Sequence, residues 1–150
     1  MKSMRKIIIV VLILMANIII LKLPMYLYAQ EQVLSPKVGS QERKIILDAL
    51  RKPVGKELKQ EVKFKVDNLK MQKDWAFMRG QPQKTDGKTI DYKFSPYKEA
   101  VEEGLFDDGI CALLHKEAGQ WKVIIYVIGA TDVAWESWDK EYKVPSAIFR

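Results

Sequence analysis

The sequence predicts an α+β fold, with an N-terminal helix packed on a curved antiparallel sheet of four or more strands. Three observations predict it. Apolar residues recur at helical spacing in residues 41–52, apolar and charged residues alternate in 62–67, and two apolar segments joined by a short turn occupy 110–128. A sheet with an apolar face needs a cover, which the early helix supplies. We therefore expect one domain over residues 41–150.

The first element is a helix over residues 41–52. Ser40 is a favourable N-cap residue, and apolar residues follow it at spacings of three and four positions. Pro53 and Gly55 come next, and both residue types are unfavourable inside a helix. We therefore expect the helix to end at Lys52.

Two antiparallel strands are expected after the helix. The alternation over 62–66 predicts a half-buried strand, and its change of phase near Asn68 indicates a bulge. The next strand is expected over 75–79, because Gly80 and Pro82 both interrupt strands.

The strongest strand signal comes later in the chain. Residues 110–115 and 121–128 form a second hairpin, and its nearly continuous apolar sequence predicts the centre of the sheet. Residues 95–103 predict a short helix. Residues 133–142 predict a turn or a short helix capped by Thr131 or Asp132. Helix-on-curved-sheet arrangements include the cystatin-like and nuclear-transport-factor-like folds, a likeness that carries no activity.

The first thirty residues have the layout of a secretory signal. A short basic segment precedes an apolar run over 7–21, and a polar stretch containing Ala29 follows. The apolar run is shorter than the roughly twenty residues that a membrane-spanning helix needs. We expect a signal peptide at 1–29, a tether at 30–40 and a periplasmic or secreted domain. The alternative is a leader that is retained as a membrane anchor.

The charge distribution does not favour a nucleic-acid-binding protein. The formal net charge is +6, but four of the 25 Lys and Arg residues lie in the leader and none of the 19 Asp and Glu residues does, which leaves +2 for residues 30–150. Such a mixed surface is typical of a soluble domain. Lysine is dense from Lys56 to Lys73, but acidic residues are interleaved, as on a solvent-exposed strand face.

The sequence contains no familiar motif for a metal, a phosphate or a nucleophile. One histidine, His115, and one cysteine, Cys111, cannot form the usual nitrogen and sulfur zinc site. The glycines form neither of the phosphate-binding motifs GxGxxG and GxxxxGK(S/T). The GxSxG motif of a nucleophilic serine is also absent. We therefore predict no metal, no cofactor and no catalytic residue set. The apolar neighbours of Cys111 predict a small buried side chain, with a reactive thiol as the alternative.

Asp132 is the carboxylate with the most informative position. It follows the most apolar strand and precedes Trp135 and Trp138, beside which it would be partly desolvated. Desolvation raises the pKa of a carboxylate and suits proton transfer. The alternative is a helix N-cap. His115 is the other candidate base.

The tryptophans divide into two pairs. Trp75 and Trp121 lie on strands at positions that predict the core. Trp135 and Trp138 are three residues apart, hence on one helical face, where one or both can rim a pocket or interface. The candidate binding surface combines these two residues with others nearby in the predicted fold: Asp132, Arg79 and Gln81.

Several segments resemble an uncharacterised family of small secreted bacterial proteins. They are Asp74–Phe77, Gln120–Val123 and Gly129–Val133, together with Trp138 and Pro145 and an early basic helix at Glu42–Arg51. The resemblance covers about residues 41 to 150 and implies an envelope location. It carries over no activity and no catalytic residue.

Together these observations favour an exported, non-enzymatic binding module. Its expected partner is a protein or an envelope polymer, with no nucleic acid, and it would contact the membrane only through an uncleaved leader. One alternative is a small pocket enzyme or ligand-binding protein that uses Asp132 or His115 as a base. Another is a membrane-anchored accessory protein.

Overall fold

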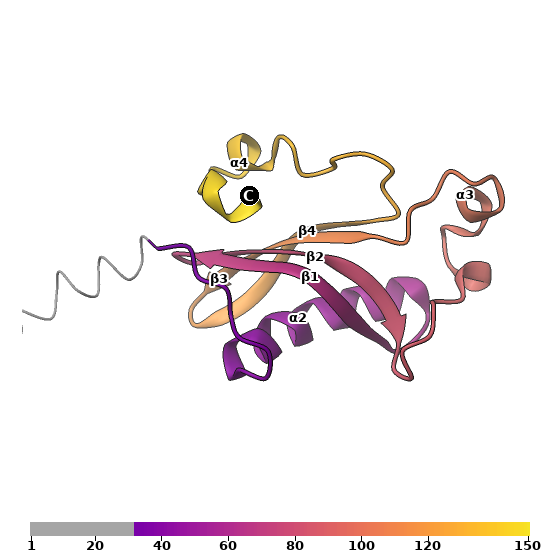
Figure 1. Cartoon of the computed structure of the whole chain (residues 1–150), viewed down its shortest axis with the longest axis horizontal. Helices are drawn as coiled ribbons and strands as arrows, with labels where there is room; N and C mark the ends of the chain where they lie inside the picture. The colour runs from indigo at the N-terminus through magenta and orange to yellow at the C-terminus, as the bar shows by residue number, and fades with distance from the viewer. Residues whose placement is uncertain (1–31) are drawn as a thin grey trace, which may run out of the picture. The chain divides into compact units, whose positions relative to one another are not determined.

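One long helix is followed by a four-stranded antiparallel sheet with the strand order β1-β2-β3-β4 in the computed structural model, which describes residues 32–150 (Figure 1). The folded unit spans Val33–Arg150. The helices and strands are α2 (Gln41–Leu58), β1 (Val62–Gln72), β2 (Trp75–Lys84), β3 (Ile110–Glu117) and β4 (Gln120–Ile128). Short segments connect or follow them: η1 (Tyr92–Phe94), α3 (Lys98–Glu102), α4 (Trp138–Glu141) and η2 (Ser146–Phe149). The α+β prediction is confirmed.

Helix α2 begins as expected but ends later. Ser40 Oγ accepts a hydrogen bond of 3.3 Å from the backbone N–H of Arg43. The expected end at Lys52 is wrong, because the helix continues through Pro53 to Leu58. Burial explains the continuation, since the apolar stripe extends past the proline and each of its members is fully buried: Ile46, Leu50, Val54 and Leu58.

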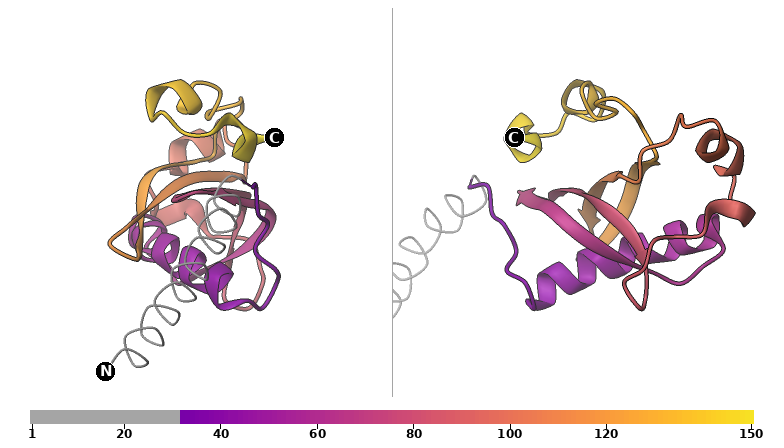
Figure 2. Two further views of the ribbon diagram at one scale, coloured as in Figure 1. Left: turned by 90° about the vertical axis from the view of Figure 1, so that its left-hand side faces the viewer. Right: turned by 45° about the vertical axis from the view of Figure 1, so that its right-hand side comes forward.

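The sheet is covered on both faces. Figures 1 and 2 show α2 on one face and the C-terminal segment with α4 and η2 on the other. Neighbouring residues of β2 therefore enter different cores: Ala76 and Met78 pack toward α2, whereas Phe77 packs with Trp138 and Ile148. The expectation of a single covered face accounted for only the first of these cores.

The expected bulge lies in β1, at Asp67. Val66 pairs with Gly80 and Asn68 pairs with Arg79, so Asp67 is the extra residue. Gly80 permits the close approach, since a Cβ atom there would lie 2.3 Å from the backbone oxygen of Lys65. The bulge and the glycine are therefore one structural feature.

The sequence predicted that strand β2 would end at Gly80, and this prediction is wrong. The strand continues to Lys84, and Pro82 pairs with Phe64 of β1. The pairing of β2 with β3 stops at Gly80, so the last residues of β2 have a strand on one side only. Proline is tolerated where one side of a strand is unpaired, because its missing N–H is then not needed.

The second hairpin is not the centre of the sheet. The central pair is β2 and β3, and β4 lies at an edge. The apolar sequence of β4 has a different cause, because both of its faces contact a core. Tyr126 packs toward α2, while Ile125 and Val127 pack toward the C-terminal segment.

Part of the predicted tether is paired with the sheet. Leu34 and Met71 exchange two backbone hydrogen bonds of 2.7 and 2.8 Å. The expected signal peptide at 1–29 lies outside the described residues. Among residues 32–150, no helix combines the length and the hydropathy needed to cross a membrane.

Candidate functional site

A pocket of about 390 Å³ lies beside the β1 bulge, on the face of the sheet that carries the C-terminal segment. Strand β2 supplies Arg79, Gly80 and Gln81, and the loop that follows β4 supplies residues 130–133 and Trp135. The pocket thus contains four of the five candidate binding residues from the sequence. They come from two segments that are separated by about fifty positions in the chain.

Asp67 reaches the pocket because of the bulge. A bulged residue is released from the regular alternation of a strand, so its side chain can be aimed elsewhere. Asp67 is exposed and lines the pocket together with Gly80, the residue opposite the bulge. The local irregularity of the sheet therefore adds a carboxylate to the site.

The loop after β4 is fixed at its start by Gly129. Its backbone has a φ of +80°, and a Cβ atom there would lie 2.0 Å from the Phe106 ring. Its N–H donates to the carbonyl of Gly109 at 2.9 Å, and its carbonyl accepts from the N–H of Asp107 at 3.1 Å. These bonds hold the loops on either side of the pocket together.

Trp135 and Arg79 form a contact at the pocket. The guanidinium carbon of Arg79 lies 5.1 Å from the centroid of the Trp135 ring, a cation–π geometry. Trp135 is half-buried, and its ring lies 5.6 Å from that of Phe77 in the core below. The indole is therefore held by packing, whereas the arginine is exposed.

The polar groups of the pocket are mostly unpaired. Among the described residues, the side chains of Asp67, Arg79 and Asp132 have no ion pair or hydrogen bond. Asp107 differs, because its Oδ1 accepts a 2.6 Å hydrogen bond from the N–H of Gly109. The lining thus carries three carboxylates and one guanidinium, which makes it acidic overall and rich in acceptors.

Asp132 is not a helix cap, contrary to one of the two expectations for it. Helix α4 begins at Trp138 with Ser137 as its N-cap residue, and Ser137 makes no side-chain capping bond. Asp132 is exposed to solvent. The desolvated environment expected beside the two indoles is therefore not present.

Trp138 does not lie in the pocket. It is 3% exposed and packs edge-on against Phe77, with ring centroids 6.3 Å apart. Trp135 precedes helix α4, so the two tryptophans do not share a helical face as the spacing predicted. Trp138 has a structural role in the second core.

His115 lies in a different hollow, of about 480 Å³, together with Trp75 and Lys143–Pro145. The imidazole stacks on the Trp75 ring with centroids 4.2 Å apart, and its Nδ1 is 3.5 Å from Oε1 of Glu117. It is not part of the lining that contains Asp132. The two candidate bases therefore belong to separate sites.

Cys111 is buried, at 4% exposure, and packs in the second core. Its Sγ lies 4.0 Å from the carbonyl oxygen of Val127. Burial raises the pKa of the thiol to about 11, which keeps it protonated near neutral pH.

Metal ligands do not gather in the described part of the chain: residues 32–150 contain no group of three or more His, Cys, Asp or Glu side chains placed to hold an ion.

Comparison with protein-family models, with curated protein sequences and with solved structures finds no match for this chain.

Sequence reasoning missed three polar residues of the pocket: Asp67, Asp107 and Thr131. A signal was available only for Asp67, because the phase change near Asn68 located the bulge. In the sequence, Asp107 and Thr131 look like ordinary turn residues. Their convergence depends on how the loop before β3 meets the loop after β4.

Proposed function

We propose that this protein is an exported, non-enzymatic binding module that holds a group of a partner protein or envelope polymer in the pocket beside the β1 bulge. One observation carries the proposal. Arg79, Asp132 and Trp135 line a single pocket, and among the described residues neither charged side chain forms an ion pair or a hydrogen bond. Unpaired polar groups around an aromatic ring are what a recognition site offers.

The charges of the pocket indicate the chemistry of the bound group. Carboxylates accept hydrogen bonds and donate none, so a lining with three of them favours a ligand group that donates. An amine, an amide or a hydroxyl-bearing segment fits this requirement. Trp135 adds an apolar surface held in place by Phe77, which reduces the entropy lost on binding.

The enzyme alternative has less support. General acid–base catalysis needs a suitably placed group with a matched pKa, and a second functional group within reach. Asp132 is exposed, and His115 lies outside the pocket. These positions favour binding over proton transfer.

The test is photo-crosslinking in cells that naturally produce the full-length protein. A photoreactive residue at Gln81 faces the pocket, and one at Lys140 on α4 serves as the position control. The double variant Arg79→Gln with Asp132→Asn removes one positive and one negative charge from the pocket. Its matched control is Lys98→Gln with Glu102→Gln, an exposed ion pair elsewhere on the surface.

We expect one adduct of defined mass from position 81, lost in the pocket variant and retained in the matched control. The four side chains changed in the pocket variant and its control are exposed, so each of these changes is expected to alter the free energy of unfolding by no more than about 1 kcal/mol. An adduct that is unaffected by the pocket variant, or that forms equally from position 140, would contradict the proposal. Recovery of the folded protein from the cytosol would contradict export.

A further inference from the structure

A second hollow, of about 760 Å³, lies between the C-terminal half of α2 and the start of β1. We call it the basic groove. Basic side chains dominate its lining, with Glu61 as the one acidic residue among the lining residues described. The basic residues of the groove are Arg51, Lys52, Lys56, Lys59 and Lys63.

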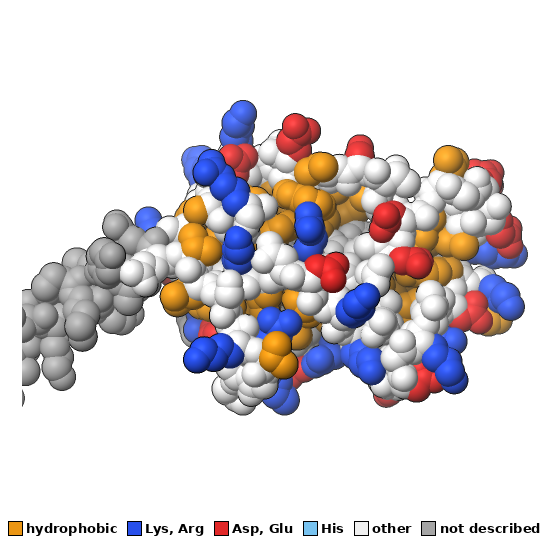
Figure 3. All heavy atoms as spheres, in the orientation of Figure 1, with side chains coloured by type: hydrophobic (Ala, Val, Ile, Leu, Met, Phe, Trp, Pro, Cys, Tyr) orange, Lys and Arg blue, Asp and Glu red, His pale blue; other side chains and the backbone are white. Residues whose placement is uncertain are grey.

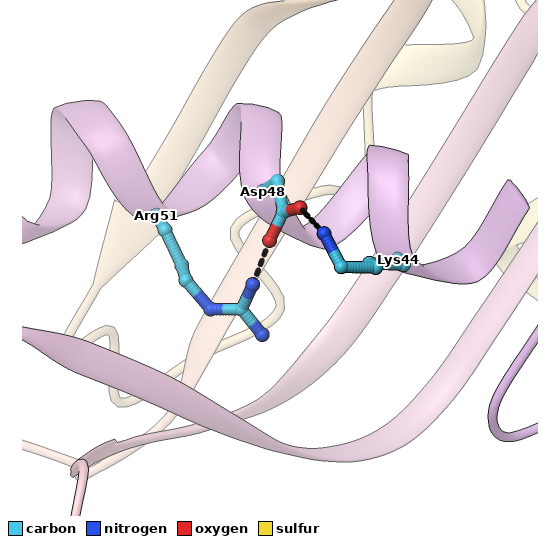
Figure 4. A network of polar contacts seen from close by, with 3 residues as sticks. All are labelled: Lys44, Asp48 and Arg51. Atoms are coloured by element: carbon cyan, nitrogen blue, oxygen red, sulfur yellow. Dashed lines mark hydrogen bonds and ion pairs between the residues drawn. The ribbon is translucent and has the colours of Figure 1, made fainter. Parts of the chain in front are cut away.

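In the described part of the chain, four of these five cations form no ion pair, although Lys63 lies close enough to Asp86 to help lower the pKa of that carboxyl. Of the thirteen other lysines in residues 32–150, five have an acidic partner: Lys44, Lys88, Lys98, Lys116 and Lys122. In the groove only Arg51 has one. Figure 4 shows that its partner, Asp48, also binds Lys44, with a Nζ–Oδ2 distance of 2.8 Å. Within residues 32–150, the four groove lysines form no ion pair.

Glu57, which lies between Lys56 and Lys59 in the sequence, already has partners. Glu57 accepts hydrogen bonds from the hydroxyl groups of Tyr97 and Tyr126, one on each carboxylate oxygen. Glu57 is therefore engaged by the two tyrosines and does not line the groove. Two backbone carbonyl groups in the last turn of the helix also have partners: that of Gly55 accepts from the N–H of Gln60 at 3.1 Å, and that of Lys56 from the N–H of Lys59 at 3.4 Å.

The arrangement of the lysines suits an extended anion. Lys52 and Lys56 lie about one turn apart on one face of α2, and Lys59 follows as the C-cap residue in the left-handed conformation. Cations that are spread along a hollow in this way suit a chain of phosphates and not a single phosphate group. Among the described residues that line the groove, none is aromatic, so the groove offers no aromatic ring on which nucleic-acid bases could stack.

This local charge stands out against the rest of the molecule. Figure 3 shows Lys and Arg side chains interspersed with Asp and Glu on the face drawn, as expected for a small net charge. The pocket beside the β1 bulge has the opposite sign to the groove, with three carboxylates and one guanidinium. The two hollows therefore favour different ligands.

We propose that the basic groove binds a base-free phosphodiester polymer of the cell envelope. The binding is electrostatic, and the lysine ammonium groups contact successive phosphates of one chain. This site is separate from the pocket beside the β1 bulge, and its envelope ligand rests on the export proposed above.

The experiment measures binding of the full-length protein to synthetic poly(glycerol phosphate) by titration at several salt concentrations. The test variant is Lys52→Gln with Lys56→Gln and Lys59→Gln. All three positions are exposed, and glutamine has nearly the helix propensity of lysine at the two helical positions, Lys52 and Lys56, so the fold is retained. The matched control is Lys37→Gln with Lys98→Gln and Lys140→Gln, which removes the same charge outside the groove. Residues 1–31 are identical in all three proteins.

We expect the groove variant to bind at least about tenfold more weakly, while the control variant binds like the natural sequence. The slope of log affinity against log salt concentration should fall in magnitude by about two for the three lost lysines. Equal weakening in both variants would show a general charge effect and overturn the proposal. Tighter binding to single-stranded DNA of equal charge, or equal binding to polyglutamate, would overturn the assignment of a base-free phosphodiester.

Discussion

The indole N–H of Trp121 donates a hydrogen bond of 2.7 Å to Oε1 of Glu42. The ammonium group of Lys116 contacts the same oxygen at 3.1 Å. Glu42 lies in the first turn of α2, and Trp121 begins the apolar part of β4, so this contact joins the helix to the edge of the sheet. Because Trp121 is 6% exposed, its N–H needs this partner within the protein.

Loss of this carboxylate should therefore destabilise the domain. We expect Glu42→Ala to lower the free energy of unfolding by about 1–3 kcal/mol, since it leaves a buried donor unsatisfied. Glu42→Gln keeps an oxygen acceptor and should cost less. Trp121→Ala removes the ring from the core and should cost roughly 3–5 kcal/mol. Urea denaturation measures all three, and a Glu42→Ala protein as stable as the natural sequence would contradict the role of the contact.

Gly80 is the position where a single added methyl group should disturb the candidate site. In Gly80→Ala the new Cβ would meet the Lys65 carbonyl oxygen at 2.3 Å, and a backbone group cannot move away easily. We expect a loss of about 1–3 kcal/mol in the free energy of unfolding and amide chemical-shift changes centred on the bulge. Asp67→Asn keeps the backbone of the bulge and is the control, with an expected change within about 0.5 kcal/mol. Equal stability of both variants would show that the bulge tolerates a side chain opposite it.

The parts of the fold that the sequence predicted well depend on local patterns. The Ser40 cap, the alternation in β1 and the bulge near Asn68 are each signalled within a few residues. The tight connection between β3 and β4 is signalled in the same way, by Ala118 and Gly119, which both have positive φ. For the candidate site, local patterns located Asp132 and Trp135 but gave no distance between them and Arg79.

The parts that failed depend on tertiary burial. Pro53 reads locally as a helix end, but Val54 and Leu58 beyond it are fully buried, and their burial keeps the chain helical. The sequence predicted Trp138 at the rim of a pocket or interface. It is buried instead, because the C-terminal segment covers the second face of the sheet. No local pattern states that a sheet has two cores, which is why β4 was expected at the centre instead of an edge.

Alkaline pH should weaken the link between Glu57 and Tyr126. Burial, and then the hydrogen bond to Glu57, raise the pKa of the Tyr126 hydroxyl from 10.0 to about 12. Below pH 10 the phenol is neutral in the folded and the unfolded chain, so its contribution to stability is complete. Between pH 10 and about pH 12 only the unfolded form ionises, and stability falls as the pH rises.

The variant Tyr126→Phe isolates this effect from other groups that titrate at high pH. The difference in unfolding free energy between the natural sequence and the variant should be constant below pH 10 and shrink above it. Thermal or urea unfolding over this range measures the difference, and absorbance of the phenolate reports the ionisation directly. A difference that does not change with pH would show that the hydroxyl is equally free to ionise in both states.

Cys111 provides a probe of the second core, because it is a single thiol in a buried position. A thiol reagent needs the thiolate, and burial both raises the pKa of Cys111 to about 11 and blocks access. We expect labelling of the folded protein near neutral pH to be slow and to accelerate greatly in urea, with Ile148→Ala speeding the native reaction by loosening the cover over the sheet. Lys140→Gln on the exposed side of α4 is the control and should leave the rate unchanged. Native labelling as fast as in urea would identify Cys111 as a reactive thiol and contradict its place in the core.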